Sequence, residues 1–187
     1  MAFIVGYLAI DVLKREDYDV GMMILTNDSQ FELNYKNLRD LCQNNMTIDA
    51  NEDGKLLFSS YYMPLDPEVN DRLNGANSAK LYALLQSNET MLVVCDNSVE
   101  TGLNDIAHFE DLSAIFPDNS HVDGYRFNLK DTRLLKAIGF ENGLAQPSTY
   151  IALRKVSDNL KPKEKEEMQK YYDAALEVLK ALAEQYS

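Results

Sequence analysis

Apolar residues gather in short runs along the chain, and polar turns separate these runs. Two such runs, 3–13 and 18–27, flank a charged turn and predict a pair of strands that form a hairpin. The run 90–97 is the most hydrophobic and predicts a strand at the centre of a sheet. Further strands are predicted over residues 46–50, 55–63, 125–129 and 148–156.

An Asp-Gly pair separates two of these runs. Asp53 and Gly54 lie between 46–50 and 55–63, and Asp-Gly between apolar runs is a strong signal for a tight hairpin turn. We therefore expect these two strands to pair with each other in antiparallel fashion.

Apolar residues at helical spacing occupy the stretches between the strands. They predict helices over residues 34–45, 68–87, 103–116 and 131–140. The longest pattern begins at Pro162, which suits a first helical turn. Its apolar seam consists of Met168, Tyr172, Ala175, Leu179, Leu182 and Tyr186. We expect this helix to pack on its own domain, with pairing between two protomers of a homodimer as the alternative.

Together these elements predict an α+β fold, with a mixed, mostly antiparallel sheet packed by helices and a long C-terminal helix. The chain has 187 residues, of which 45% are hydrophobic, enough to form one core without disulfides or a structural metal. We expect an α+β core domain over residues 1–160, followed by an amphipathic helix at 161–187.

Cysteine usage and hydropathy indicate a cytoplasmic protein. Cys42 and Cys95 lie in apolar surroundings, which favours two buried free thiols, with a disulfide between them as the alternative. The apolar run at 3–10 is too short for a membrane span, and charged residues follow it directly. We expect the cytoplasm of a bacterial or phage-infected cell, or a host cytosol, and no membrane partner.

The net charge of −12 is unevenly distributed along the chain. Residues 40–54 and 81–125 contain no lysine or arginine and account for the whole imbalance. Such a field repels phosphate and acidic lipid, so direct binding to nucleic acid is not expected. Its natural partners are basic proteins or cations, and the alternative interpretation is a set of solvated surfaces that aid solubility.

The acidic turn at 49–54 resembles the first half of a calcium-binding loop. Asp49, Asn51 and Asp53 place oxygen ligands at alternate positions before a glycine, as a hard cation requires. The twelfth position is Ser60 rather than glutamate, and the flanking runs read as strands. A plain hairpin turn is therefore the favoured interpretation.

Two buried strands end near aspartates, Asp11 and Asp96. Carboxylates at the ends of neighbouring strands can hold divalent cations that activate water. In the order of its elements the chain is loosely similar to nucleases of the ribonuclease H-like fold. This resemblance implies a metal-dependent nuclease or hydrolase that uses Asp11, Asp96 and Glu68.

A third metal hypothesis concerns the two histidines. Asp105, His108, His121 and Asp123 have side chains suited to a divalent metal, and the first two are spaced to share one helical face. No third histidine or thiolate lies nearby in the sequence. A structural role for both histidines is the alternative.

The leading functional hypothesis is a binding or inhibitory protein, because the sequence lacks nucleotide-binding and nucleophile motifs. Its carboxylates would engage a basic groove of a nucleic-acid enzyme as a mimic of nucleic acid. In composition the chain resembles small acidic proteins of phages and mobile elements that block host defence nucleases. We expect no cofactor, and a structural or assembly subunit is a further alternative. The expected contact residues are Asp96, Glu100, Asp105, Glu110, Asp111, Asp118 and Asp123.

Overall fold

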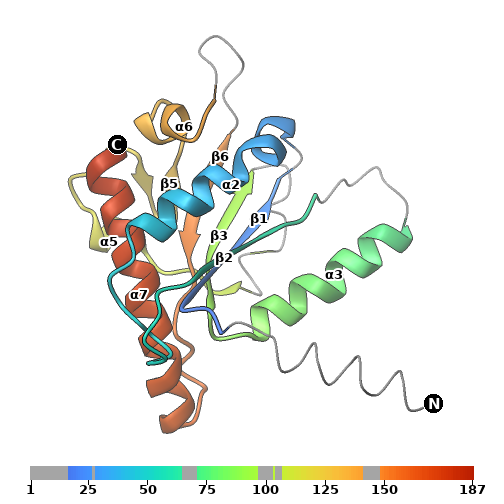
Figure 1. Ribbon diagram of the computed structural model, residues 1–187, viewed down its shortest axis with the longest axis vertical. Helices are drawn as coiled ribbons and strands as arrows, with labels where there is room; N and C mark the ends of the chain where they lie inside the picture. The colour runs from blue at the N-terminus through green and yellow to red at the C-terminus, as the bar shows by residue number, and fades with distance from the viewer. Residues whose placement is uncertain (1–16, 27, 65–70, 97–102, 104–106, 141–147) are drawn as a thin grey trace.

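The computed structural model contains one mixed sheet packed by helices (Figure 1). The residues that the structure describes are 17–26, 28–64, 71–96, 103, 107–140 and 148–187. Within them the sheet has six strands in the order β2-β1-β3-β6-β5-β4. The α+β class and the single domain predicted from the sequence are confirmed.

The strands are β1 (Val20–Leu25), β2 (Phe58–Tyr62), β3 (Thr90–Asp96), β4 (Val122–Asp123), β5 (Arg126–Asn128) and β6 (Thr149–Leu153). The helices are α2 (Ser29–Asn44), α3 (Asp71–Gln86), α5 (Leu112–Ile115), α6 (Arg133–Ala137) and α7 (Pro162–Tyr186).

Half of the sheet is parallel. Strand β1 pairs with β2 on one side and with β3 on the other, both in parallel. Parallel neighbours need crossover connections, and α2 and α3 provide them on opposite faces of the sheet. The other half is antiparallel, with β6 beside β3 and the short strands β5 and β4 beyond it.

The predicted hairpin between 46–50 and 55–63 is wrong. Residues 46–50 form no strand, and β2 pairs instead with β1 in parallel. The reason is the buried carboxylate of Asp19, which accepts hydrogen bonds from the backbone N–H groups of Asn51 and Leu57. These bonds hold the 49–57 loop against the start of β1. The predicted partner of β1 in the first hairpin, 3–13, lies outside the described residues.

The predicted helix over 103–116 is also wrong at 108–111, where the chain is not helical. Phe109 forms an isolated bridge with Arg154, and the N–H of Glu110 donates to the carbonyl of Leu153 at 2.8 Å. The chain therefore runs beside the end of β6 here, and helix α5 begins only after Asp111, which caps it.

Both faces of the sheet are covered. One face packs on α2, α6 and α7 and carries the larger core, while the other packs on α3. Every residue of β1 and β6 is buried, and β3 is buried up to its last residue, Asp96. The central position predicted for the 90–97 run is thereby confirmed.

Helix α7 packs on the sheet of its own domain along the predicted seam. Met168, Ala175, Leu179 and Leu182 are buried there, and the two tyrosines of the seam are partly buried at its margins. Among the helices of the described residues, none combines the length and the apolar character that a membrane span requires.

Cys42 and Cys95 are both buried as free thiols. They belong to hydrophobic clusters on opposite faces of the sheet. Burial raises the pKa of the Cys42 thiol far above its ordinary value, so the thiol form is strongly favoured. The predicted pair of buried thiols is confirmed.

Candidate functional site

Three of the predicted contact residues lie at one edge of the sheet, two where α5 and β4 meet and one in the loop between them. The N–H of Ser113 donates to the carbonyl of Gly124 at 3.0 Å, and the N–H of Gly124 donates to the Ser113 hydroxyl at 2.8 Å. These bonds join the first turn of α5 to the turn that follows β4. We call Asp111, Asp118 and Asp123 the acidic edge.

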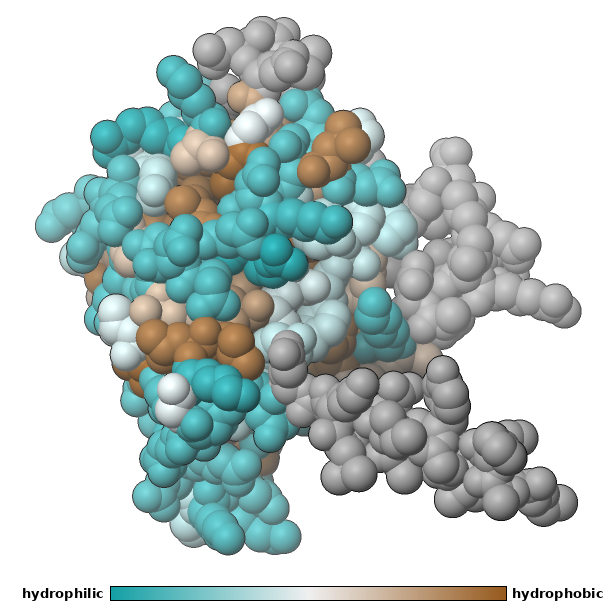
Figure 2. Space-filling view, viewed as in Figure 1, coloured by the Kyte–Doolittle hydropathy of each residue, from teal (hydrophilic) through white to brown (hydrophobic). Residues whose placement is uncertain are grey.

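The carboxylates of the acidic edge are exposed, and none of the three forms an ion pair within the described residues. Elsewhere among the described residues, ion pairs join Arg39 to Asp40, Lys161 to Glu164, Lys165 to Asp158 and Lys170 to Glu52. Exposed carboxylates without an ion pair in the described residues also occur elsewhere, for example Glu32 on α2 and Glu166 on α7. Figure 2 shows that the face bearing α2 and α7 is largely hydrophilic, with apolar groups exposed in separate patches.

One arginine lies close to this edge. Arg126 is the partner of Asp123 in the β4–β5 register. Its guanidinium carbon lies 5.0 Å from the ring centroid of Tyr125 and 5.3 Å from that of Tyr150. The positive charge is thus held over two aromatic rings, and Asp123 projects from the exposed end of β4.

A groove of about 540 Å³ adjoins the acidic edge at Asp118. One wall is the loop after α5, and the other is the last turn of α7, which lies at the same side of the sheet in Figure 1. The lining residues are Phe116, Pro117, Asp118, Asn119, Ser120, His121, Ala183, Glu184 and Ser187. Glu184 was missed in the sequence because it lies far along the chain, in a helix whose charges are mixed.

The other predicted contact residues do not join this edge. Asp96 ends β3, and two strands lie between β3 and β4. Glu110 is half-buried and accepts a hydrogen bond from the Tyr172 hydroxyl at 3.4 Å. Glu100 and Asp105 lie outside the described residues.

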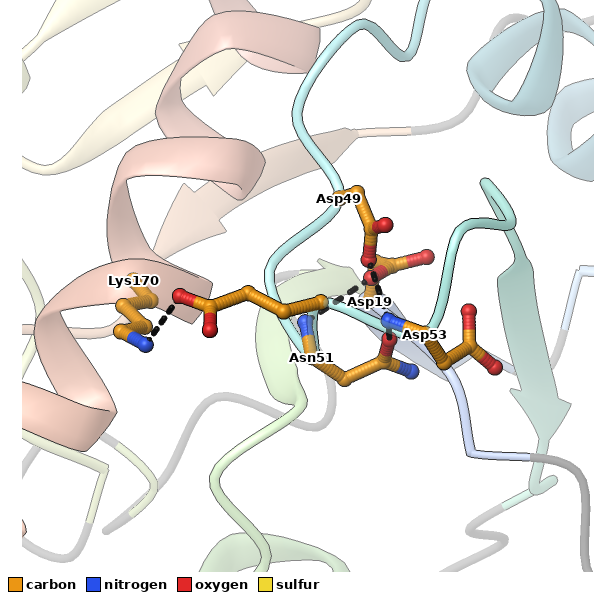
Figure 3. Close-up of polar contacts among 6 residues, drawn as sticks. Asp19, Asp49, Asn51, Asp53 and Lys170 are labelled. Carbon is orange, nitrogen blue, oxygen red and sulfur yellow. Dashed lines mark hydrogen bonds and ion pairs between the residues drawn. The ribbon is translucent and has the colours of Figure 1, made fainter.

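The predicted calcium-binding turn is a hydrogen-bonded loop (Figure 3). The two carboxylate oxygens of Asp49 accept from the backbone N–H groups of Asp53 and Gly54, at 3.2 and 2.7 Å. The side-chain oxygen of Asn51 also accepts from Asp53, at 3.0 Å. Lys170 reaches this turn and pairs with Glu52 at 2.5 Å. Backbone donors thus occupy the oxygens that a cation would need, and cation binding stays a prediction.

The carboxyl ends of the parallel strands meet where the hydrolase hypothesis would place a site. The connection after β1 enters α2 on one face, while Leu103, which follows β3, packs on the other. In open sheets ligands bind at such a point. Asp96 lies there, but Asp11 and Glu68 lie outside the described residues.

Tyr62 marks this end of the sheet. Its hydroxyl donates to the carbonyl of Thr26 at 3.2 Å. Burial, and then the charges of Glu32, Asp28 and Asp96, raise the pKa of Tyr62. Among the described residues, no group of three or more carboxylate, histidine or cysteine side chains has an arrangement that could hold a metal ion. The hydrolase hypothesis stays a prediction.

The two histidines are held at opposite ends of β6. The carbonyl of His108 accepts from the N–H of Lys155, just beyond β6. The carbonyl of His121 accepts from Asn128, which pairs with Tyr150 at the other end of that strand. His121 lines the groove, whereas His108 lies apart from it. The structure therefore does not bring the predicted histidine pair together.

No family model, curated protein or solved structure matches this chain. The functional assignment therefore depends on the geometry of the described residues.

Proposed function

We propose that the protein binds a basic partner protein through the acidic edge. The observation that carries this proposal is the set of three exposed carboxylates at one edge of the sheet, none of which forms an ion pair within the described residues. A basic partner would supply the missing countercharges. Complementary charge speeds encounter and sets orientation more than it raises affinity.

The proposed partner class is a nucleic-acid enzyme with a positively charged groove. Carboxylates fixed on a rigid sheet edge can take the place of phosphates in such a groove, because both are oxygen anions that accept from arginine and lysine. An inhibitor of this kind would resemble the anti-defence proteins of phages and mobile elements in its action. Its binding would weaken as the salt concentration rises, because exposed charges are screened.

The edge can be tested with two variants that lose the same charge. One is D111N/D118N/D123N, which we call the edge variant; the other is D40N/E52Q/D158N, which we call the paired variant because its carboxylates form ion pairs. Asparagine at position 111 is still a good N-cap for α5, so the edge variant should keep its fold.

The three proteins are immobilised and exposed to a bacterial lysate with and without competing duplex DNA. We expect a basic protein that the wild type and the paired variant retain, that the edge variant loses, and that duplex DNA displaces. If every retained protein binds the edge variant as well as the paired variant, the proposal is refuted. Retention that duplex DNA does not affect would contradict the mimicry of nucleic acid.

A further inference from the structure

The groove beside the acidic edge has the composition of a site for a long basic side chain. Its volume of about 540 Å³ lies within the range of roughly 300–1,000 Å³ typical of binding pockets. Phe116, Pro117 and Ala183 give it apolar surface. Asp118 and Glu184 each contribute a carboxylate, one from each wall, and no lysine or arginine of the described part of the chain lines the groove.

The two walls of the groove are fixed in place. The side chain of Asn119 joins them by donating to the Ser187 hydroxyl at 2.8 Å. Within the loop wall, the N–H of His121 donates to the Asn119 side chain at 2.9 Å, and the His121 carbonyl accepts from Asn128 at 2.8 Å. A groove that is already formed loses little conformational entropy when it binds.

Neither carboxylate of the groove is neutralised within the described residues. Asp118 and Glu184 are exposed and form no ion pair there. A guanidinium does lie beside the groove: the Nε of Arg133 donates to the carbonyl of Ser187, one of the lining residues, at 3.1 Å. Arg133 itself does not line the groove.

We infer that this groove binds an arginine side chain of the partner. The inference rests on the proposed function and specifies its anchoring contact. Arginine fits better than lysine for two reasons. Its planar guanidinium can stack on an aromatic ring such as Phe116, and its fork of donors can reach two carboxylates at once. Its aliphatic stem would cover Pro117 and Ala183.

The test uses glycine-flanked peptides that carry a single arginine, lysine or citrulline. Citrulline has nearly the shape of arginine but no charge. Binding is followed by amide chemical shifts of the isotope-labelled protein. We expect the arginine peptide to shift the resonances of 116–121 and 183–187 and to bind more tightly than the lysine peptide. We expect the citrulline peptide not to bind.

Two double variants of equal charge supply the control. D118N/E184Q alters the groove, and D111N/D123N alters the acidic edge outside it. We expect the first to weaken binding of the arginine peptide by at least about threefold, the scale of two exposed ion pairs, and the second to leave it unchanged.

Equal losses in both double variants, or shifts spread over all acidic surfaces, would overturn the arginine site. That outcome is distinguishable from failure of the proposed function, which is judged by retention of a basic partner on the edge and paired variants. If a partner is retained through the edge but the single-arginine peptide does not bind the groove, only this inference is refuted.

Discussion

Asp19 is the residue that holds the 49–57 loop against the sheet. It is fully buried, and its carboxylate accepts from the N–H groups of Asn51 at 3.1 Å and Leu57 at 2.8 Å. The N–H of Asp19 in turn donates to the Leu57 carbonyl at 2.9 Å. These bonds explain why the Asp-Gly signal in the sequence did not produce a hairpin.

Replacing Asp19 with alanine should destabilise the protein. The substitution leaves two backbone donors without an acceptor, and each such loss costs about 1–3 kcal/mol. We expect the free energy of unfolding to fall by roughly 2–4 kcal/mol in urea denaturation followed by circular dichroism. The exposed neighbour Asp17 supplies the control, and equal effects of D19A and D17A would show that the buried carboxylate has no such role.

Tyr172 should give the stability of the protein a dependence on alkaline pH. Burial, and then the charge and hydrogen bond of Glu110, raise the pKa of Tyr172 to about 12. Because the folded pKa lies above the unfolded value of roughly 10, the neutral phenol favours folding. This contribution is fully present below pH 10 and is lost as the pH rises towards 12.

Phenylalanine at position 172 removes the ionisable group but keeps the ring. We expect the wild type to lose more stability than Y172F between pH 8 and pH 11, measured by urea unfolding at both values. The same substitution at Tyr82, which is 54% exposed, serves as the reference. A wild type and Y172F that lose stability in parallel would contradict the role given to the buried phenol.

At the scale of elements, strongly periodic segments were predictable from the sequence. Strands β1, β3 and β6 and helix α7 lie where continuous apolar runs or the helical seam predicted them. Segments whose conformation depends on hydrogen bonds to distant parts of the chain were not predictable. The conformation after the 46–50 run is set by the hydrogen bond from Asn51 to Asp19, and that of the stretch at Phe109 by its bridge to Arg154. Neither long-range partner can be deduced from local spacing.

The end of helix α3 depends on Arg154, which directly follows strand β6 beside β3. One guanidinium nitrogen of Arg154 donates to the carbonyls of Ser87 at 3.2 Å and Thr90 at 2.5 Å, and another donates to Leu85 at 2.6 Å. The last carbonyls of a helix lack partners within the helix and carry partial negative charge. Arg154 satisfies them, although burial lowers its pKa to about 10.

Methionine at position 154 keeps the aliphatic bulk but removes these donors. We expect a loss of about 2–4 kcal/mol in the free energy of unfolding and faster amide exchange in the last turn of α3. Lysine should give an intermediate loss, because it keeps the charge without the planar fork. K155M, at the exposed neighbouring position, is the control. Unchanged exchange in α3 would show that Arg154 does not cap it.

At the scale of the whole molecule, acidic residues that belong to one segment of the sequence lie at different places in the fold. Asp111 and Asp123 lie at one edge because the Ser113–Gly124 contact joins their elements, and Asp118 lies in the loop between α5 and β4. Asp96 is the last residue of β3 and lies away from this edge. The sequence predicted that the 81–125 segment is strongly acidic. Which of its carboxylates share a surface depends on the strand order, which the sequence did not predict. Glu184 joins the groove only through the docking of α7.

The most direct measurement is the affinity of a short arginine-rich peptide for the edge and paired variants, at low salt and at about 0.15 M salt. Both variants have the same net charge, so a difference between them reports the position of the charge rather than its amount. We predict that the edge variant binds at least about threefold more weakly than the paired variant, and that added salt narrows the gap. Equal affinities at low salt would contradict the account.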